Sequence, residues 1–215
     1  MTRVLYLHGF ASAPSSSKAR SFREHLEGVG ASVEIPDLAS GDFEHLTITA
    51  QLGVIERCAK GQPVCLVGSS MGGYLAALYA ARHPEVSRLV LLAPAFGFAR
   101  RWAEYLGPER VAEWRQRGVL EVFHYGDNRM HELHYGLLED AVRYEPFPNF
   151  RMPALILHGI HDDVVPVASS REFTVAHSNA RLEVLESGHQ LLDVLPCLLP
   201  RATGFLMNGA KPSLK

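Results

Sequence analysis

The stretch LVGSSMGGYLAAL, residues 66–78, joins an apolar run to a helix-like segment through two serines and three glycines. Glycine stands two positions before and two positions after Ser70, and this Gly68-x-Ser70-x-Gly72 pattern predicts a sharp strand-to-helix turn. Such a turn strains the serine and projects its hydroxyl above the sheet edge, at a helix N-terminus that favours an oxyanion. Because Ser69 lacks this symmetric spacing, the pattern selects Ser70 as the nucleophile. The motif is short, so its assignment depends on residues further along the chain.

Two later strands end in the partners that a serine nucleophile needs, a base and a third group that orients the base. In sheets with this kind of turn, the acid and then the histidine follow later strands. The run ALILHGIHDDVVP (154–166) supplies Asp162 and Asp163, and the run LEVLESGHQLL (182–192) supplies His189. We predict Asp162 as the acid and His189 as the base, because Asp163 suits the capping role that acidic loop residues usually have.

A tetrahedral oxyanion needs two backbone N–H donors. We expect one from Met71, which follows the predicted nucleophile, and the other from Phe10 in the loop after the first strand. Gly9 lets that backbone approach closely. The neighbouring His8 suits a structural role in the loop better than a catalytic one. The stretch SAPSSSKA (12–19) is expected to cap a helix rather than to contact substrate.

Strands alternate with helices along most of the chain. This order predicts a parallel sheet covered on both faces, because each right-handed crossover lays a helix on the sheet. Continuous apolar runs such as VCLV and LVLLA are typical of strands buried on both faces. The predicted fold class is therefore α/β, with a doubly wound, six-stranded parallel sheet. The predicted strands are 3–8, 32–35, 64–67, 88–93, 154–158 and 182–185, and the predicted helices are 17–29, 43–59, 72–82, 166–177 and 190–205.

The segment 96–153 is too long for a simple crossover and is rich in aromatic residues. We expect a small lid that lines a pocket, with the alternative that the rings form only the core of the insertion. We predict a single domain over residues 1–207 with this insertion at about 96–153, and a flexible C-terminal tail over 208–215. Its arginines are expected on a solvated helical face rather than at an anionic substrate: Arg100, Arg101, Arg110, Arg115 and Arg117.

Composition limits the partners of the chain. Its 215 residues are 47% apolar and 20% charged, with a net charge of -2, which is typical of a globular domain without the basic surface that nucleic acid requires. The longest apolar stretch, 89–99, is too short for a membrane span. No signal-peptide pattern precedes the first strand, and Cys58, Cys65 and Cys197 lack metal-ligand spacing. We expect a cytoplasmic protein with reduced cysteines, no metal and no cofactor, which is a monomer by default with a weak dimer as the alternative.

Four short motifs resemble, in chain order, the oxyanion loop, nucleophile elbow, acid loop and histidine loop of the α/β-hydrolase superfamily: YLHGF (6–10), GSSMGG (68–73), HGIHDDVVP (158–166) and SGH (187–189). The resemblance covers residues 3–205, and the stretch YLHGFASAPSSSKA (6–19) is similar to small bacterial serine carboxylesterases. The resemblance implies Ser70 as nucleophile, Asp162 as acid and His189 as base. It also implies backbone donors at Phe10 and Met71. The two antiparallel strands that open larger members have no counterpart here, so six parallel strands are expected.

The motifs and the resemblance together predict a cofactor-free serine hydrolase that cleaves carboxylic esters of small, mainly apolar substrates through an acyl-enzyme on Ser70. Serine at the elbow argues against dehalogenases and dienelactone-type hydrolases, which in this superfamily carry aspartate and cysteine there. Thioesters undergo the same acyl-enzyme chemistry, so a thioesterase acting on acyl-CoA or acyl-protein is the nearest alternative. A lyase or acyl-transferase on the same fold, and a ligand receptor that keeps the three groups, are more distant alternatives.

Overall fold

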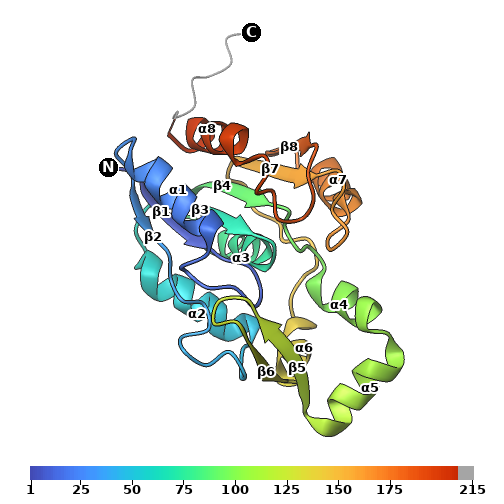
Figure 1. The fold of residues 1–215 in the computed structure, drawn as a ribbon. Helices are drawn as coiled ribbons and strands as arrows, with labels where there is room; N and C mark the ends of the chain where they lie inside the picture. The colour runs from blue at the N-terminus through green and yellow to red at the C-terminus, as the bar shows by residue number, and fades with distance from the viewer. Residues whose placement is uncertain (208–215) are drawn as a thin grey trace.

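A sheet of six strands forms the centre of the molecule (Figure 1), and the computed structural model describes residues 1–207. The strands lie in the order β2-β1-β3-β4-β7-β8, and every neighbouring pair is parallel. The predicted α/β class and six-stranded parallel sheet are therefore confirmed. The predicted tail, residues 208–215, lies outside the described residues. The strands are Arg3–Leu7 (β1), Ser32–Glu34 (β2), Val64–Ser69 (β3), Val86–Leu92 (β4), Ala154–Gly159 (β7) and Ala180–Leu185 (β8).

Helices cover both faces of the sheet, so the sheet is doubly wound as expected (Figure 1). Helices α1 (Ser17–Glu27) and α8 (Leu195–Met207) pack on one face, where Phe22 is fully buried. Helices α2 (Ile48–Ala59), α3 (Met71–Ala80) and α7 (Val167–Ala176) pack on the other. Successive residues of the inner strands point to opposite faces, so each strand contributes to both cores. A fully buried large apolar side chain contributes about 1.5–3 kcal/mol, and these two cores hold the strand ends in place.

Side-chain caps set where the early helices begin. Ser16 precedes α1 and its hydroxyl accepts a hydrogen bond from the Ala19 N–H at 3.4 Å, which is the capping role predicted for residues 12–19. The helix predicted to start at residue 43 starts instead at Ile48. Thr47 has an extended backbone, and its hydroxyl accepts from the Ala50 N–H at 3.0 Å, so the helical pattern upstream of it belongs to a turn.

The last helix also begins later than the predicted start at residue 190. Leu191 has a φ of 56°, which a right-handed helix does not contain, so the chain makes a loop before α8 starts at Leu195. Pro200 lies inside α8, where it removes one backbone N–H donor. The loop of residues 190–194 separates this helix from the strand end that carries His189.

The insertion of residues 96–153 contains three helices and an antiparallel hairpin: α4 (Phe98–Leu106), α5 (Pro108–Arg117), β5 (Val119–His124), β6 (Arg129–His134) and α6 (Gly136–Ala141). The hairpin was not predicted. Buried side chains of the insertion, including Phe96, Trp114 and Leu133, belong to the same apolar core as the α2–α3 face of the sheet. Part of the aromatic set thus serves as core, whereas Tyr105 and Tyr125 are exposed, and the lid role of the segment stays a prediction.

Two of the insertion's arginines make exposed pairs one helical turn apart, Arg100 with Glu104 at 3.7 Å and Arg117 with Glu113 at 3.1 Å. This matches the predicted solvated face, and pairs of this kind contribute little to stability. None of the helices over residues 1–207 has the length and apolar character needed to cross a membrane.

Candidate active site

Ser70 lies in the strained turn that the glycine spacing predicts. Its φ and ψ are 54° and -115°, it follows the last residue of β3, and α3 begins at the next residue. A Cβ atom at Gly68 would collide with the backbone of Gly72, and a Cβ atom at Gly72 would collide with the Leu7 carbonyl of β1. The Ser70 N–H donates to the Leu92 carbonyl at 2.8 Å, which fixes the turn to the neighbouring strand. The small residues are therefore required by close backbone contact on both sides of the serine.

The structure brings Ser70, Asp162 and His189 together, although 119 positions separate the first and last. His189 Nε2 lies 3.0 Å from Ser70 Oγ, and His189 Nδ1 lies 2.7 Å from Asp162 Oδ2. The carboxylate can only accept, so Nδ1 carries the proton and Nε2 is free to accept the serine proton. All three residues follow the carboxyl ends of parallel strands β3, β7 and β8, where open α/β sheets place their ligands.

Asp162 is buried, whereas Asp163 is exposed. The Asp162 Oδ1 atom accepts from the Val164 N–H at 2.9 Å and from the Val165 N–H at 2.7 Å. Burial disfavours the charged carboxyl, but hydrogen bonds from His158, His189 and the Val165 backbone outweigh it and hold the pKa of Asp162 well below its usual range. The carboxyl that contacts the histidine is therefore ionised at neutral pH.

His158 is a site neighbour that sequence reasoning missed. Its ring is fully buried, and Nε2 lies 2.8 Å from the Val165 carbonyl and 3.1 Å from Asp162 Oδ2. Both of these are acceptors, so Nε2 carries the proton, and Nδ1 accepts from the Ser170 hydroxyl at 2.8 Å. His158 thus anchors the loop of residues 162–165 through its contacts with Asp162 and the Val165 carbonyl. Its position four residues before Asp162, at the end of an apolar strand, was the available signal.

The two backbone groups predicted to stabilise an oxyanion, the N–H groups of Phe10 and Met71, have no hydrogen-bond acceptor within residues 1–207. The Phe10 loop is close to Ser70, since a Cβ atom at Gly9 would lie 3.5 Å from the Ser70 Cβ. His8 accepts from the Leu38 N–H at 3.3 Å and contacts the Gly9 carbonyl at 3.0 Å. Burial lowers the pKa of His8, so the ring is a neutral anchor of this loop, as expected from the sequence.

Lys18 is a second neighbour that was missed. Its Nζ donates to the Ser69 hydroxyl at 3.1 Å. Burial lowers the pKa of Lys18 to about 8, and attraction to Asp162 opposes the shift only in part. The sequence signal was positional, because residue 18 precedes Phe22 by one helical turn and so lies on the apolar face of α1.

Aromatic rings surround Phe10 on the side of the insertion. Its ring centroid lies 5.0 Å from that of Trp102, 5.5 Å from that of Phe43 and 6.5 Å from that of Phe98. The Trp102 ring also packs against the buried Trp114 at 5.1 Å. The loop that carries Phe10 and the insertion therefore share one aromatic cluster.

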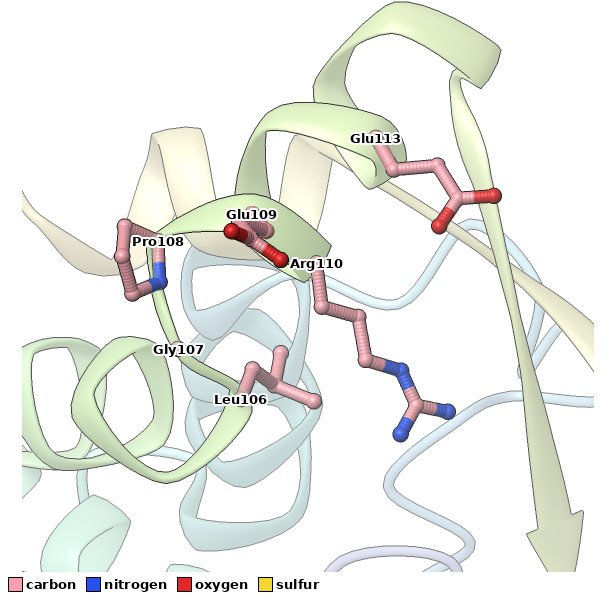
Figure 2. Close-up of a pocket in the computed structure, with 6 residues that line it drawn as sticks. All are labelled: Leu106, Gly107, Pro108, Glu109, Arg110 and Glu113. Carbon is pink, nitrogen blue, oxygen red and sulfur yellow. The ribbon is translucent and has the colours of Figure 1, made fainter.

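A separate hollow of about 440 Å³ lies at the turn between α4 and α5 (Figure 2). None of the five predicted site residues lines it. Its charged side chains Glu109, Arg110 and Glu113 are exposed, so it lacks the apolar lining of an acyl pocket. The lining residues are Leu106, Gly107, Pro108, Glu109, Arg110 and Glu113.

Comparison with known proteins relates the chain to one family and to several hydrolases. The model of an uncharacterised protein family, UPF0227, matches residues 3–205. The chain is 27% identical to the palmitoyl-protein thioesterase ABHD10, mitochondrial, of Bos taurus, over 76% of this chain and 58% of the relative. It is 26% identical to the monoacylglycerol lipase ABHD6 of Homo sapiens, over 88% of this chain and 70% of the relative. The chain thus spans less than two thirds of the length of the ABHD10 relative.

Among solved structures, Est1E from Butyrivibrio proteoclasticus with ferulic acid bound superposes with a TM-score of 0.80 at 22% identity. The match covers 96% of this chain and 88% of that one. At this identity the likeness shows a shared fold.

Proposed function

Because the chain belongs to the UPF0227 family and to the α/β-hydrolase superfamily, we propose that it is a serine hydrolase that cleaves carboxylic esters of small, mainly apolar substrates. The observation that carries the proposal is the continuous hydrogen-bonded chain from the Ser70 hydroxyl through His189 to Asp162, with distances of 3.0 and 2.7 Å. In this role Ser70 is the nucleophile, His189 the general base and acid, and Asp162 the group that orients the imidazole.

Acylation begins when His189 Nε2 takes the Ser70 proton as the serine oxygen attacks the ester carbonyl. The carbonyl oxygen becomes an oxyanion, which the N–H groups of Phe10 and Met71 stabilise; losing one such donor typically costs about 3–4 kcal/mol of barrier. The tetrahedral intermediate collapses, the bond to the alkoxy oxygen breaks, and His189 delivers its proton to the leaving alcohol. A water molecule then repeats the sequence on the acyl-enzyme, releasing the acid and restoring the serine.

The ionised state of Asp162 supports this mechanism. Its carboxylate accepts the Nδ1–H of His189, which leaves Nε2 as the basic atom facing the serine. When the imidazole is protonated during the reaction, the buried negative charge stabilises the imidazolium without taking its proton. The backbone donors of Val164 and Val165 hold the carboxylate in this orientation.

The aromatic cluster around Phe10 supports an apolar substrate. A group bound to the Phe10 N–H would lie beside the rings of Phe10, Phe98 and Trp102, which are partly buried or buried. Pockets for small organic groups are lined mainly by such side chains, with a few placed polar groups. In this proposal the insertion over 96–153 acts as the lid that contributes these rings.

Thioester hydrolysis is the second candidate function. Relatives from three mammals carry the name palmitoyl-protein thioesterase ABHD10, and the chemistry at Ser70 would be the same for an acyl thioester. Oxygen esters and thioesters of the same acyl group differ only in the leaving atom. A matched series of nitrophenyl esters and acyl thioesters, compared by kcat/KM, therefore separates the two functions.

A fluorophosphonate probe tests the nucleophile directly. The wild-type chain should be labelled and should hydrolyse nitrophenyl esters, and Ser70→Ala should lose both. Ser69→Ala is the matched control, because it removes a hydroxyl from the adjacent residue and should keep the labelling. Labelling that persists in Ser70→Ala, or wild-type protein that binds an ester without turnover, contradicts the proposal.

A further inference from the structure

The turn of the β5–β6 hairpin gathers three side chains whose chemistry is unrelated to the serine site. His124 Nδ1 lies 3.0 Å from Asp127 Oδ1, and His131 Nε2 lies 2.8 Å from Asp127 Oδ2. One potential ligand atom from each residue falls within 4.8 Å of the other two. Within residues 1–207 this is the one group of three or more histidine, cysteine or acidic residues so arranged.

The two imidazoles are held in place by the fold. Their side chains are only 12% exposed, and the Phe43 ring packs against both, with centroids 4.7 Å from His124 and 5.5 Å from His131. The hairpin register pairs His124 with Arg129 and His131 with Val122, which sets both histidines on one face at the turn. The ring nitrogens that face Asp127 are therefore preorganised.

We propose that His124, Asp127 and His131 bind a divalent transition-metal ion of the zinc type. Imidazole nitrogen and carboxylate oxygen are preferred ligands of Zn²⁺, at about 2.0–2.2 Å. In a tetrahedral site such ligands lie about 3.3 Å from one another, so small side-chain rotations bring these atoms to coordination distance. The partly exposed Asp127 leaves the fourth position to solvent.

A carboxylate lies behind one of the histidines. Glu44 Oε1 is 3.6 Å from His131 Nδ1, the ring nitrogen that faces away from the three-residue cluster. Metal-bound histidines commonly donate their second ring N–H to a carboxylate, which fixes the tautomer that coordinates. Glu44 could accept the Nδ1–H of His131 in this way if its carboxylate moved slightly closer to the ring.

Arg129 contacts two of the three proposed ligands, Asp127 and His131. Its Nε donates to Asp127 Oδ2 at 2.8 Å and lies 3.2 Å from His131 Nε2. The Arg129 side chain is 70% exposed, so it can leave towards solvent when a cation replaces it. The guanidinium neutralises the carboxylate in the metal-free form and competes with the metal.

The cluster is joined to the loop that carries Phe10. The Tyr125 N–H donates to the Ala11 carbonyl at 2.8 Å, and the Phe43 ring contacts Phe10 as well as the two histidines. A bound ion would fix the hairpin turn and, through these contacts, this loop. The proposal does not depend on the hydrolase activity, so binding and stability are sufficient to test it.

The experiment uses the full chain stripped with a chelator and titrated with Zn²⁺ by calorimetry and with Co²⁺ by visible absorption. The wild type should bind one equivalent, gain Co²⁺ ligand-field bands and show a higher Tm with excess Zn²⁺. His131→Gln and Asp127→Asn should each weaken binding at least tenfold. Arg129→Ala should bind more tightly, because it removes the competing cation and leaves the ligands intact. His134→Ala is the control, a histidine on the same hairpin that packs against His45 and should bind like the wild type.

Four results would overturn the proposal, and the first is a wild-type chain that takes up no Zn²⁺ at concentrations up to about a millimolar. The second is a His131→Gln chain that binds like the wild type, and the third is a His134→Ala chain that loses binding; either would assign the ion to other histidines. The fourth is weaker binding in Arg129→Ala. Circular dichroism of each metal-free variant establishes that the fold is retained. Arg129→Ala keeps both buried rings, so weaker binding in that variant would contradict the proposal even if the histidine variants failed to fold.

Discussion

Replacing Lys18 by methionine should stabilise the protein at neutral pH, although it removes a hydrogen bond. The ammonium group of Lys18 lies beside the turn that carries Ser70 and donates to the Ser69 hydroxyl. Burial lowers the pKa of Lys18 from 10.5 to about 8, so the fold disfavours the charged form despite the attraction of Asp162. Methionine has a similar length and carries no charge that must be desolvated.

The size of the effect can be worked from the pKa shift. Lowering the pKa from 10.5 to about 8 disfavours the charged lysine by about 3 kcal/mol below pH 8. Solvent reaches part of the side chain and screens this penalty, so we expect Lys18→Met to raise the free energy of unfolding by about 2 kcal/mol at pH 6. The lost hydrogen bond opposes this gain only in part, because Ser69 keeps the Tyr6 hydroxyl as a neighbour.

The gain should depend on pH with a defined sign. Between about pH 8 and 10.5 the unfolded wild type binds more protons at Lys18 than the folded form does, so its stability rises with pH in this window. The advantage of Lys18→Met should therefore shrink to about 1 kcal/mol at pH 9.5. Urea unfolding at pH 6, 7.5 and 9.5, followed by the fluorescence of Trp102 and Trp114, measures it.

Arg20→Met is the matched control, since Arg20 is an exposed cation two positions along the same helix. Its effect on the free energy of unfolding should be small and independent of pH. A Lys18→Met chain that is less stable than the wild type at pH 6, by an amount that does not change up to pH 9.5, would refute the reasoning. That result would mean that the charged lysine stabilises the turn through its contacts.

Three further predictions concern the turn and the hydrogen-bonded chain. Gly72→Ala should lower the free energy of unfolding by about 3 kcal/mol or prevent folding, because its Cβ meets a β1 carbonyl, whereas Gly136→Ala fits open space; urea unfolding compares them. Asp162→Asn should lower kcat about 10⁴-fold for nitrophenyl esters through the wrong imidazole tautomer, whereas Asp163→Asn should leave kcat unchanged. His189→Gln should abolish ester hydrolysis, because the amide cannot take the serine proton; kcat for nitrophenyl esters measures this.

The sheet and the arrangement of the three side chains were predictable because local pattern and topology agree. Strands buried on both faces are continuously apolar, and the glycines around Ser70 reflect a close backbone contact that only small residues permit. Since parallel strands end at one edge of a sheet, residues after three different strands had to lie close together. Asp162 was preferred over Asp163 from the sequence, and it is the carboxylate that contacts His189. The reason given was wrong, because the loop hydrogen bonds expected at Asp163 are accepted by Asp162 Oδ1.

The features that sequence reasoning missed depend on contacts between distant segments. The β5–β6 hairpin joins the body of the molecule through hydrogen bonds from Tyr125 to Ala11 and from His134 to Glu44, and no local pattern encodes these partners. The contact of Lys18 likewise joins distant segments of the chain. Its position on an apolar helix face was visible, but its partner Ser69 lies 51 residues away.

Backbone strain near the site indicates how the fold holds it. Four non-glycine residues with positive φ lie in the segments after strands β1, β3, β4 and β8: Ala11, Ser70, Ala93 and Leu191, at 52°, 54°, 44° and 56°. Each such residue costs roughly 1–3 kcal/mol unless its surroundings over-determine it. For Ser70 and Ala93 the sheet does so, since the Ser70 N–H donates to the Leu92 carbonyl at 2.8 Å and the Ala93 N–H to the Leu157 carbonyl at 2.9 Å. These two turns extend the strand ladder, so the position of Ser70 is set by the most buried part of the molecule. Substitutions that loosen the central strands should therefore disturb the hydrogen-bonded chain before they unfold the protein.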